Sequence, residues 1–121
     1  MRRHRFSMIA VYGIKNCDSV KKALKWLDNH NVDYKFHDYN KHGVDDAFLS
    51  RAMDEHGWEI IINRKGTTWR QIPEDDRQDM TRDQAELLAH AKPSVIKRPI
   101  LSSGDSIIVG FDVDVYKDTL L

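Results

Sequence analysis

The sequence predicts an α/β fold, in which short strands and helices alternate along one domain. Residues 8–12 form an apolar run rich in strand-forming side chains, an amphipathic helix pattern follows, and residues 32–37 read as a second strand. Two further apolar runs, 100–101 and 107–109, flank a Ser-Ser-Gly-Asp turn and predict a β-hairpin, after which Asp112 offers the cap of a last helix. The length of 121 residues suits a single domain that buries a core without disulfides or metals.

The first half of this pattern predicts a βαβ unit. Gly13 closes the run at 8–12, and Asp18 and Ser19 offer a helix N-cap. The apolar positions behind this cap recur at helical spacing: Val20, Ala23, Leu24 and Leu27. Because one helix joins the two strands, residues 32–37 should pair with the first strand in parallel.

The middle of the chain reads mainly as helical. Gly43 opens a helical stretch that Gly57 ends. Residues 58–62 fit a strand or a helix equally, because so short an apolar run has no decisive periodicity. Residues 63–71 read as a polar loop. The Thr-Arg-Asp-Gln sequence at 81–84 has the form of a capping box and predicts a further helix.

Charge and cysteine content exclude several classes of protein. Nineteen Lys and Arg balance nineteen Asp and Glu, so no net field attracts nucleic acid or an anionic membrane. No apolar stretch approaches the ~20 residues that span a bilayer. A single cysteine forms no intramolecular disulfide, which is typical of the reducing cytoplasm. We therefore expect a cytoplasmic protein whose partners include neither nucleic acid nor a membrane.

Cys17 lies between the end of the first predicted strand and the start of the first predicted helix. The unpaired N–H groups and the positive dipole end of a helix N-terminus favour a thiolate and can lower a cysteine pKa. Lys15 and Lys21 add positive charge nearby. The alternative is that a lone cysteine is a small buried hydrophobic side chain. The polar turn around it, with Asn16 and Asp18, favours a reactive thiol.

Three segments of the chain resemble the signature blocks of the ArsC/Spx family. They are YGIKNCDSVKKA at 12–23, NRKGTTWR at 63–70 and IKRPIL at 96–101, with VGF at 109–111 after the third. The order and spacing are similar to the family's over residues 8–121, and most similar to those of its YffB subgroup. The resemblance implies a thioredoxin-like fold, βαβ followed by ββα, with a helical insertion at about 43–92 and an N-terminal extension at 1–7.

The resemblance also implies a site. In glutathione- and glutaredoxin-linked arsenate reductases, a cysteine attacks arsenate, and three arginines hold the oxyanion through paired hydrogen bonds. Matching the blocks places the nucleophile at Cys17 and two arginines at Arg64 and Arg98. The third arginine falls where this chain has residues 109–111, and this departure argues against arsenate. The expected substrate-binding residues are Lys15, Asn16, Pro99 and Gly110.

Pro99 directly precedes the third predicted strand. Bonds before proline are cis in only roughly 5–6% of folded cases, so a trans bond is the ordinary alternative. In thioredoxin-type folds, however, a cis-proline at this point in the order of elements faces the active cysteine. We therefore expect a cis Arg98–Pro99 bond beside the Cys17 turn.

The chain requires a second thiol from outside. Position 20 is valine, so the Cys-x-x-Cys pair with which a redox protein resolves its own mixed disulfide is missing. A single nucleophilic thiol must pass its intermediate to another thiol, and glutathione is the abundant small candidate. The prediction is a monomeric, glutathione-dependent thiol oxidoreductase with glutaredoxin as a further candidate partner, glutathione as co-substrate, and no bound cofactor or metal.

Two other functions stay open. Spx proteins resemble this fold, bind RNA polymerase and regulate transcription, although their redox switch uses the Cys-x-x-Cys pair. A relative that keeps the fold without catalysis is the other, because the third arginine is missing. Three further features are interpreted as structural: the six histidines lack zinc-site spacing, Trp58 and Trp69 pack rather than stack on bases, and the acidic residues 74–76 lead into a helix.

Overall fold

The computed structural model describes residues 9–104 and 106–121. They divide into two compact units: unit 1 holds the described residues up to Tyr39 and from Arg98 to Leu121, and unit 2 is Asn40–Lys97. The helical insertion expected at 43–92 lies within the sequence of unit 2. Three parts of the predictions lie outside the described residues: the expected N-terminal extension at 1–7, Met8 of the predicted first strand and Asp105 of the predicted hairpin turn.

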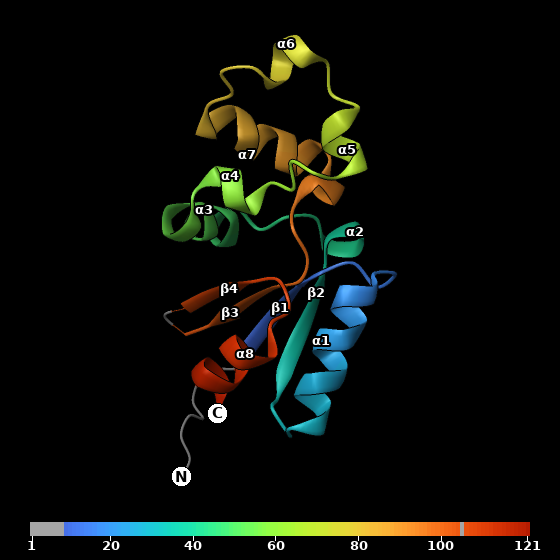
Figure 1. The fold of residues 1–121 in the computed structure, drawn as a ribbon, viewed down its shortest axis with the longest axis vertical. Coiled ribbons are helices and arrows are strands. Elements are labelled where there is room, and N and C mark those ends of the chain that lie inside the picture. The colour runs from blue at the N-terminus through green and yellow to red at the C-terminus, as the bar shows by residue number, and fades with distance from the viewer. Residues whose placement is uncertain (1–8, 105) are drawn as a thin grey trace. The chain divides into compact units, whose positions relative to one another are not determined.

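Unit 1 contains a four-stranded mixed sheet with the order β2-β1-β3-β4 (Figure 1). β1 runs parallel to β2, and β3 is antiparallel to both β1 and β4. The strands are β1 (Ile9–Gly13), β2 (Tyr34–Asp38), β3 (Ile100–Ser103) and β4 (Ser106–Val109). A βαβ unit followed by a hairpin and a helix is the thioredoxin-like arrangement, so the predicted fold class is confirmed.

One face of the sheet is covered by α1 (Asp18–Asn29) and α8 (Val113–Leu120). Alternate side chains of the strands meet the helices there, as the two-residue period of a strand requires. The buried members of this core are Ile9, Val11, Ala23, Trp26, Leu27, Leu101, Ile108 and Tyr116. Fully burying one large apolar side chain contributes about 1.5–3 kcal/mol, so this cluster is the main source of stability in unit 1.

The helix caps of unit 1 differ in part from the prediction. Asp112 caps α8 as expected, because its carboxylate accepts hydrogen bonds from the backbone N–H groups of Asp114 and Val115. The N-cap of α1 is Cys17, whereas Asp18 already lies inside the helix. The prediction chose a residue type with a strong cap preference, but the backbone leaves its extended conformation one residue earlier.

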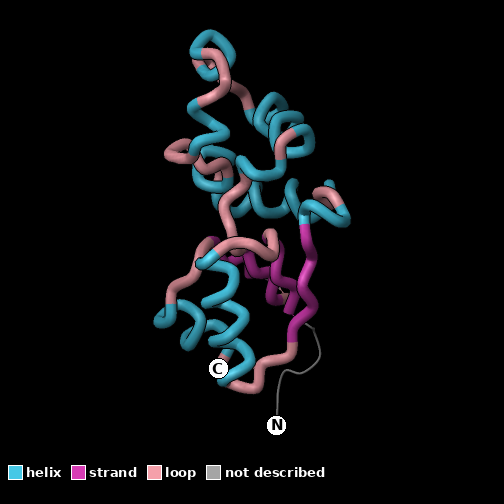
Figure 2. Tube along the Cα trace, turned by 90° about the vertical axis from the view of Figure 1, so that its right-hand side faces the viewer, coloured by secondary structure: helices cyan, strands magenta, loops and turns pink. Residues whose placement is uncertain are grey.

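The segment of unit 2 forms helices and loops apart from one isolated β-bridge (Figure 2). Its helical elements are α2 (Tyr39–His42, beginning at the last residue of unit 1), α3 (Asp46–His56), α4 (Trp58–Ile61), α5 (Thr67–Arg70), α6 (Glu74–Arg77), α7 (Arg82–Ala91) and the 3₁₀ helix η1 (Pro93–Val95). In the part of the chain that the structure describes, no helix has the length and apolar character needed to cross a bilayer.

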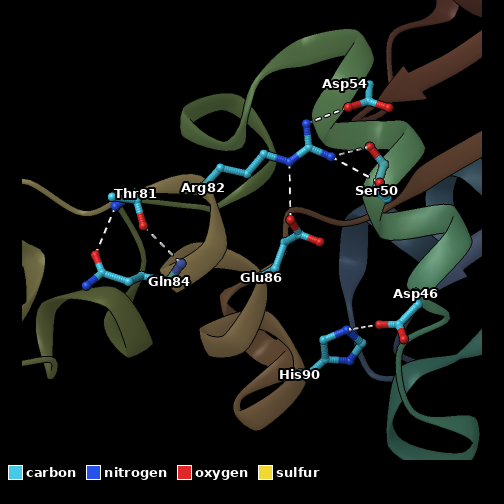
Figure 3. A network of polar contacts seen from close by, with 8 residues as sticks. All are labelled: Asp46, Ser50, Asp54, Thr81, Arg82, Gln84, Glu86 and His90. Carbon is cyan, nitrogen blue, oxygen red and sulfur yellow. Dashed lines mark hydrogen bonds and ion pairs between the residues drawn. The ribbon is translucent and has the colours of Figure 1, made fainter.

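Polar contacts join α3 to α7 (Figure 3). The Arg82 guanidinium donates to Asp54 on α3 and to Glu86 on its own helix, and it also donates to the Ser50 carbonyl at 2.9 Å. A second contact joins the same two helices, because Nε2 of His90 on α7 pairs with the carboxylate of Asp46 on α3. The predicted capping box is confirmed at the start of α7, where Thr81 and Gln84 exchange hydrogen bonds.

Two local predictions for unit 2 are wrong, and one alternative that was left open is resolved. Gly43 does not open α3, whose N-cap is Asp45 accepting from the Phe48 N–H at 3.1 Å. The loop expected at 63–71 contains the one-turn helix α5. The run at 58–62, left open between strand and helix, begins with the short helix α4.

Candidate functional site

The turn after β1 presents Cys17 at the N-terminus of α1, as predicted. Cys17 has extended backbone angles (φ −145°, ψ 123°), and its carbonyl oxygen accepts the first helical hydrogen bond from the Lys21 N–H at 2.9 Å. Its thiol is not part of a disulfide and is partly exposed. Lys15 and Asn16 precede it in the turn with exposed side chains.

Three segments of unit 1 approach one another at Gly13, where this turn begins. A Cβ atom on Gly13 would lie 2.8 Å from Cγ2 of Val20 and 3.8 Å from Cβ of Arg98. Atoms at 2.8 Å overlap, so only a residue without a side chain fits between the end of β1 and the first turn of α1. The chain before β3 lies at an ordinary van der Waals distance from the same position.

Arg98 lies on this third segment, next to the cysteine. Its guanidinium forms a hydrogen bond with the Cys17 side chain. The peptide bond between Arg98 and Pro99 is cis, which confirms the prediction for this bond, and Pro99 is buried. Cys17 and Arg98 are thus two predicted catalytic residues that the structure brings into direct contact.

Several groups act on the pKa of Cys17. Partial burial alone raises the pKa, but the backbone N–H of Val20, the Arg98 guanidinium and the backbone N–H of Ser19 stabilise the thiolate more strongly. The Cys17 side chain makes no capping hydrogen bond of ordinary geometry, so we give these N–H groups an electrostatic role. The result is a pKa of Cys17 below its usual value.

Gly110 follows β4 and binds the chain beside the cis bond. Its N–H donates to the Pro99 carbonyl at 2.8 Å, and its own carbonyl accepts from the Tyr116 hydroxyl at 2.9 Å. Its φ of +84° lies in the left-handed region that favours glycine, and a Cβ there would meet no atom within 4 Å. Open space therefore borders Gly110, which lies in the segment 109–111 where the family resemblance implies a third arginine.

Arg64 belongs to unit 2 and is exposed. Its guanidinium carbon lies 5.7 Å from the centroid of the Trp58 ring, which is a cation–π distance. Trp58 in turn lies 6.3 Å from Trp69, measured between ring centroids. This contact gives Arg64 a neighbour within its own unit, and its assignment to the cysteine site stays a prediction.

Two tyrosines of unit 1 were missed by the sequence analysis. Tyr116 is fully buried and reaches Gly110 through its hydroxyl. Tyr39 is 2% exposed, and its hydroxyl has no hydrogen-bond partner among the described residues. Its ring stacks on Tyr12 at 6.4 Å between centroids. The stacking of Tyr39 joins two different strand ends, and the Tyr116 bond depends on how the chain turns between β4 and α8, so no periodic sequence pattern signals either contact.

The described residues contain no group of three or more His, Cys, Asp and Glu side chains that could hold a metal ion. The site around Cys17 combines a thiol, a guanidinium, backbone N–H groups and a proline. Such a set can stabilise a thiolate and bind an anionic group beside it.

The profile of the ArsC family matches residues 12–119. An uncharacterized protein of Haemophilus influenzae is 43% identical over 110 residues, covering 91% of this chain and 96% of that protein. A global transcriptional regulator Spx of Lactiplantibacillus plantarum is 25% identical over 109 residues, covering 88% of this chain and 82% of the regulator.

Solved structures agree with this match. A protein named YffB is 46% identical with a TM-score of 0.91, and the match covers 94% of this chain and 100% of that one. A protein related to arsenate reductase (ArsC) from Brucella melitensis is 42% identical with a TM-score of 0.75, covering 96% of this chain and 97% of that one.

Proposed function

We propose, from the premise that this chain belongs to the ArsC family, that it is a thiol oxidoreductase whose nucleophile is Cys17. The observation that carries the proposal is the contact between the Arg98 guanidinium and the thiol of Cys17, the N-cap residue of α1, whose pKa is lowered. A thiolate is the nucleophilic form of cysteine, so a lowered pKa increases the reactive fraction at neutral pH.

Glutathione is the proposed partner, and it reaches Cys17 in its oxidised form. The Cys17 thiolate attacks one sulfur of oxidised glutathione, the disulfide bond breaks, and the other half leaves as a thiolate. This forms a mixed disulfide at Cys17, which a second thiol attacks at the glutathione sulfur to release the Cys17 thiolate. The family resemblance supports this assignment, as does the single cysteine, because another molecule must resolve the intermediate.

Gly110 favours a thiol compound over arsenate. One missing charge-assisted hydrogen bond costs about 1.5–3 kcal/mol, which is roughly ten- to over a hundredfold in affinity. The open space beside Gly110 suits a bulkier ligand, and we propose that Arg98 binds a carboxylate of that ligand. We expect little or no arsenate reduction in a coupled assay, and rapid turnover of arsenate without glutathione at Cys17 would refute this choice of substrate.

The pH dependence of Cys17 alkylation tests the nucleophile. The wild-type midpoint should lie below the unperturbed value of about 8.5, and Arg98→Ala should raise it. Lys25→Ala is the matched control, because it removes the same charge from an exposed position on α1. Mass spectrometry after incubation with oxidised glutathione should show one adduct, at Cys17. A wild-type midpoint at or above about 8.5 would refute the proposal.

The remaining assignments follow the family and the composition. We propose that Lys15, Asn16 and Pro99 contribute to substrate binding, that Arg64 does so too, and that the protein is a cytoplasmic monomer with glutaredoxin as a candidate partner. Arg64→Ala tests its assignment, because a raised alkylation midpoint is expected only if Arg64 acts on the thiol.

Similarity to Spx regulators favours a second candidate, a module that binds RNA polymerase. The valine at position 20 argues against Spx-type redox switching, which needs a second cysteine there. Binding of purified RNA polymerase that is unaffected by Cys17→Ser would favour this candidate over the enzyme.

A further inference from the structure

We propose that Tyr116 is a positioning residue for the Cys17–Arg98 pair. The inference rests on the proposed function, in which that pair is the reactive centre. Tyr116 lies on α8, touches neither Cys17 nor Arg98 in any contact described above, and acts on them through Gly110 and Pro99.

Two short hydrogen bonds connect Tyr116 to the cis bond. The Tyr116 hydroxyl donates to the Gly110 carbonyl at 2.9 Å, and the Gly110 N–H donates to the Pro99 carbonyl at 2.8 Å. Pro99 is bonded directly to Arg98, whose guanidinium forms the hydrogen bond with Cys17. The path from α8 to the sulfur therefore consists of two hydrogen bonds, one peptide bond and one side-chain contact, all within unit 1.

The Tyr116 ring is held on two sides, so its hydroxyl has a fixed position. It makes edge-to-face contacts with Trp26 and Phe111, with centroid distances of 5.4 Å and 5.2 Å. Trp26 lies on α1, the helix that Cys17 caps. One ring thus packs against the helix that carries the thiol, while its hydroxyl holds the loop that carries the arginine.

Gly110 needs this hydroxyl because it has no side-chain contact to fix it. Glycine is the most flexible residue, and the surroundings of its Cβ position are empty out to 4 Å. Its conformation at φ +84° is held by its two backbone hydrogen bonds. Burial also raises the pKa of Tyr116, so the hydroxyl stays protonated and donating wherever thiol chemistry operates.

Tyr116→Phe tests the inference, because it removes the hydroxyl and keeps the ring. The Gly110 carbonyl loses its donor, Pro99 and Arg98 become less well placed, and the alkylation midpoint of Cys17 should rise. At pH 6 the alkylation rate should fall by about two- to tenfold, the range expected for one neutral hydrogen bond. Tyr34→Phe is the matched control, because Tyr34 packs against the same core and should leave the midpoint unchanged.

A double-mutant cycle separates positioning from general loosening. If Tyr116 acts through Arg98, then Tyr116→Phe should have no further effect on the midpoint in an Arg98→Ala background. An equal effect with and without Arg98 would overturn the inference, as would an unchanged midpoint in the single variant. A wild-type midpoint at or above about 8.5 would instead refute the proposed function, so the two failures are distinguishable.

A second measurement keeps the inference testable if Tyr116→Phe does not fold. Coupling is reciprocal, so removing the Arg98 side chain should be felt at the other end of the path. The amide NMR signal of Gly110 should shift in Arg98→Ala and stay in place in Lys25→Ala. Identical Gly110 signals in the wild type and Arg98→Ala would overturn the inference.

Discussion

Replacing Tyr39 with phenylalanine should stabilise the protein, which is unusual for a change at a buried position. The Tyr39 side chain is 2% exposed, and its hydroxyl has no hydrogen-bond partner among the described residues. In the unfolded chain the same hydroxyl is bonded to water. Folding therefore removes a hydrogen bond that nothing in the described structure replaces.

The size of the effect follows from the cost of burying such a group. An unsatisfied polar group costs about 1–3 kcal/mol in mutational series. Tyr39→Phe keeps the ring and its stacking on Tyr12, so we expect the free energy of unfolding to rise by about 1–2 kcal/mol. This corresponds to a higher melting temperature by roughly 3–10 °C for a domain of this size.

Urea denaturation at pH 7 measures this prediction, with Tyr116→Phe as the matched control. Both tyrosines are buried, but only the Tyr116 hydroxyl has a partner, the Gly110 carbonyl. Tyr116→Phe should therefore lower the free energy of unfolding by about 0.5–1.5 kcal/mol while Tyr39→Phe raises it. The urea slope should be the same for all three proteins, because the surface exposed on unfolding hardly changes.

Alkaline pH should widen the advantage of Tyr39→Phe. Burial raises the pKa of Tyr39 in the folded state far above the unfolded value of about 10. Stability from a raised pKa is fully present below the unfolded value and is lost as pH rises above it. Above about pH 10 the wild type loses the stability that the raised pKa of Tyr39 contributes, whereas Tyr39→Phe lacks this contribution at every pH. A urea midpoint below that of the wild type at pH 7, with an unchanged slope, would refute the reasoning.

Three further predictions concern other positions. Gly13→Ala should destabilise the protein by about 1–3 kcal/mol in urea, because its Cβ would lie 2.8 Å from Val20; an unchanged midpoint would contradict this packing. Thr81→Ala removes the capping box of α7 and should cost about 1 kcal/mol in thermal denaturation, whereas Thr81→Ser should cost less. The lowered pKa of Cys17 contributes stability that is present above its unfolded pKa and is lost as pH falls through its folded pKa. The difference in stability between the wild type and Cys17→Ser should therefore shrink on acidification through that window, and a difference that grows would show the opposite sign.

Local signals in the sequence predicted the elements that local interactions determine. The capping box at Thr81 and the cap at Asp112 depend on residues two or three positions away, and both are confirmed. The helix α5 gave no such signal, because one turn is too short to show a periodic pattern. Its formation depends on distant contacts instead: Trp69 is buried, and the Thr68 hydroxyl bonds that of Ser94 at 2.8 Å.

The candidate site likewise has a part that local sequence signals predict and a part that depends on distant contacts. The place of Cys17 at a helix start is visible in the sequence, because a strand, a polar turn and a helix pattern follow one another there. The approach of Arg98 depends on the pairing of β1 with β3, and the sequence suggested it only through the family resemblance. Tyr39 and Tyr116 carried no signal, because a buried tyrosine reads as an ordinary core residue until its hydroxyl is traced to a partner.

Unit 1 consists of two chain segments, so its cysteine site is completed late in biosynthesis. β1 pairs with β3, where Tyr12 lies opposite Ile100, so the whole of unit 2 is translated between the two strands. At about 5–20 residues per second, Cys17 leaves the ribosome several seconds before Arg98 exists. Through that interval it has neither the guanidinium nor the strands β3 and β4 of the sheet. The nascent chain therefore carries a thiol without its arginine, and the complete site arises only once the segment from Arg98 onward has been made.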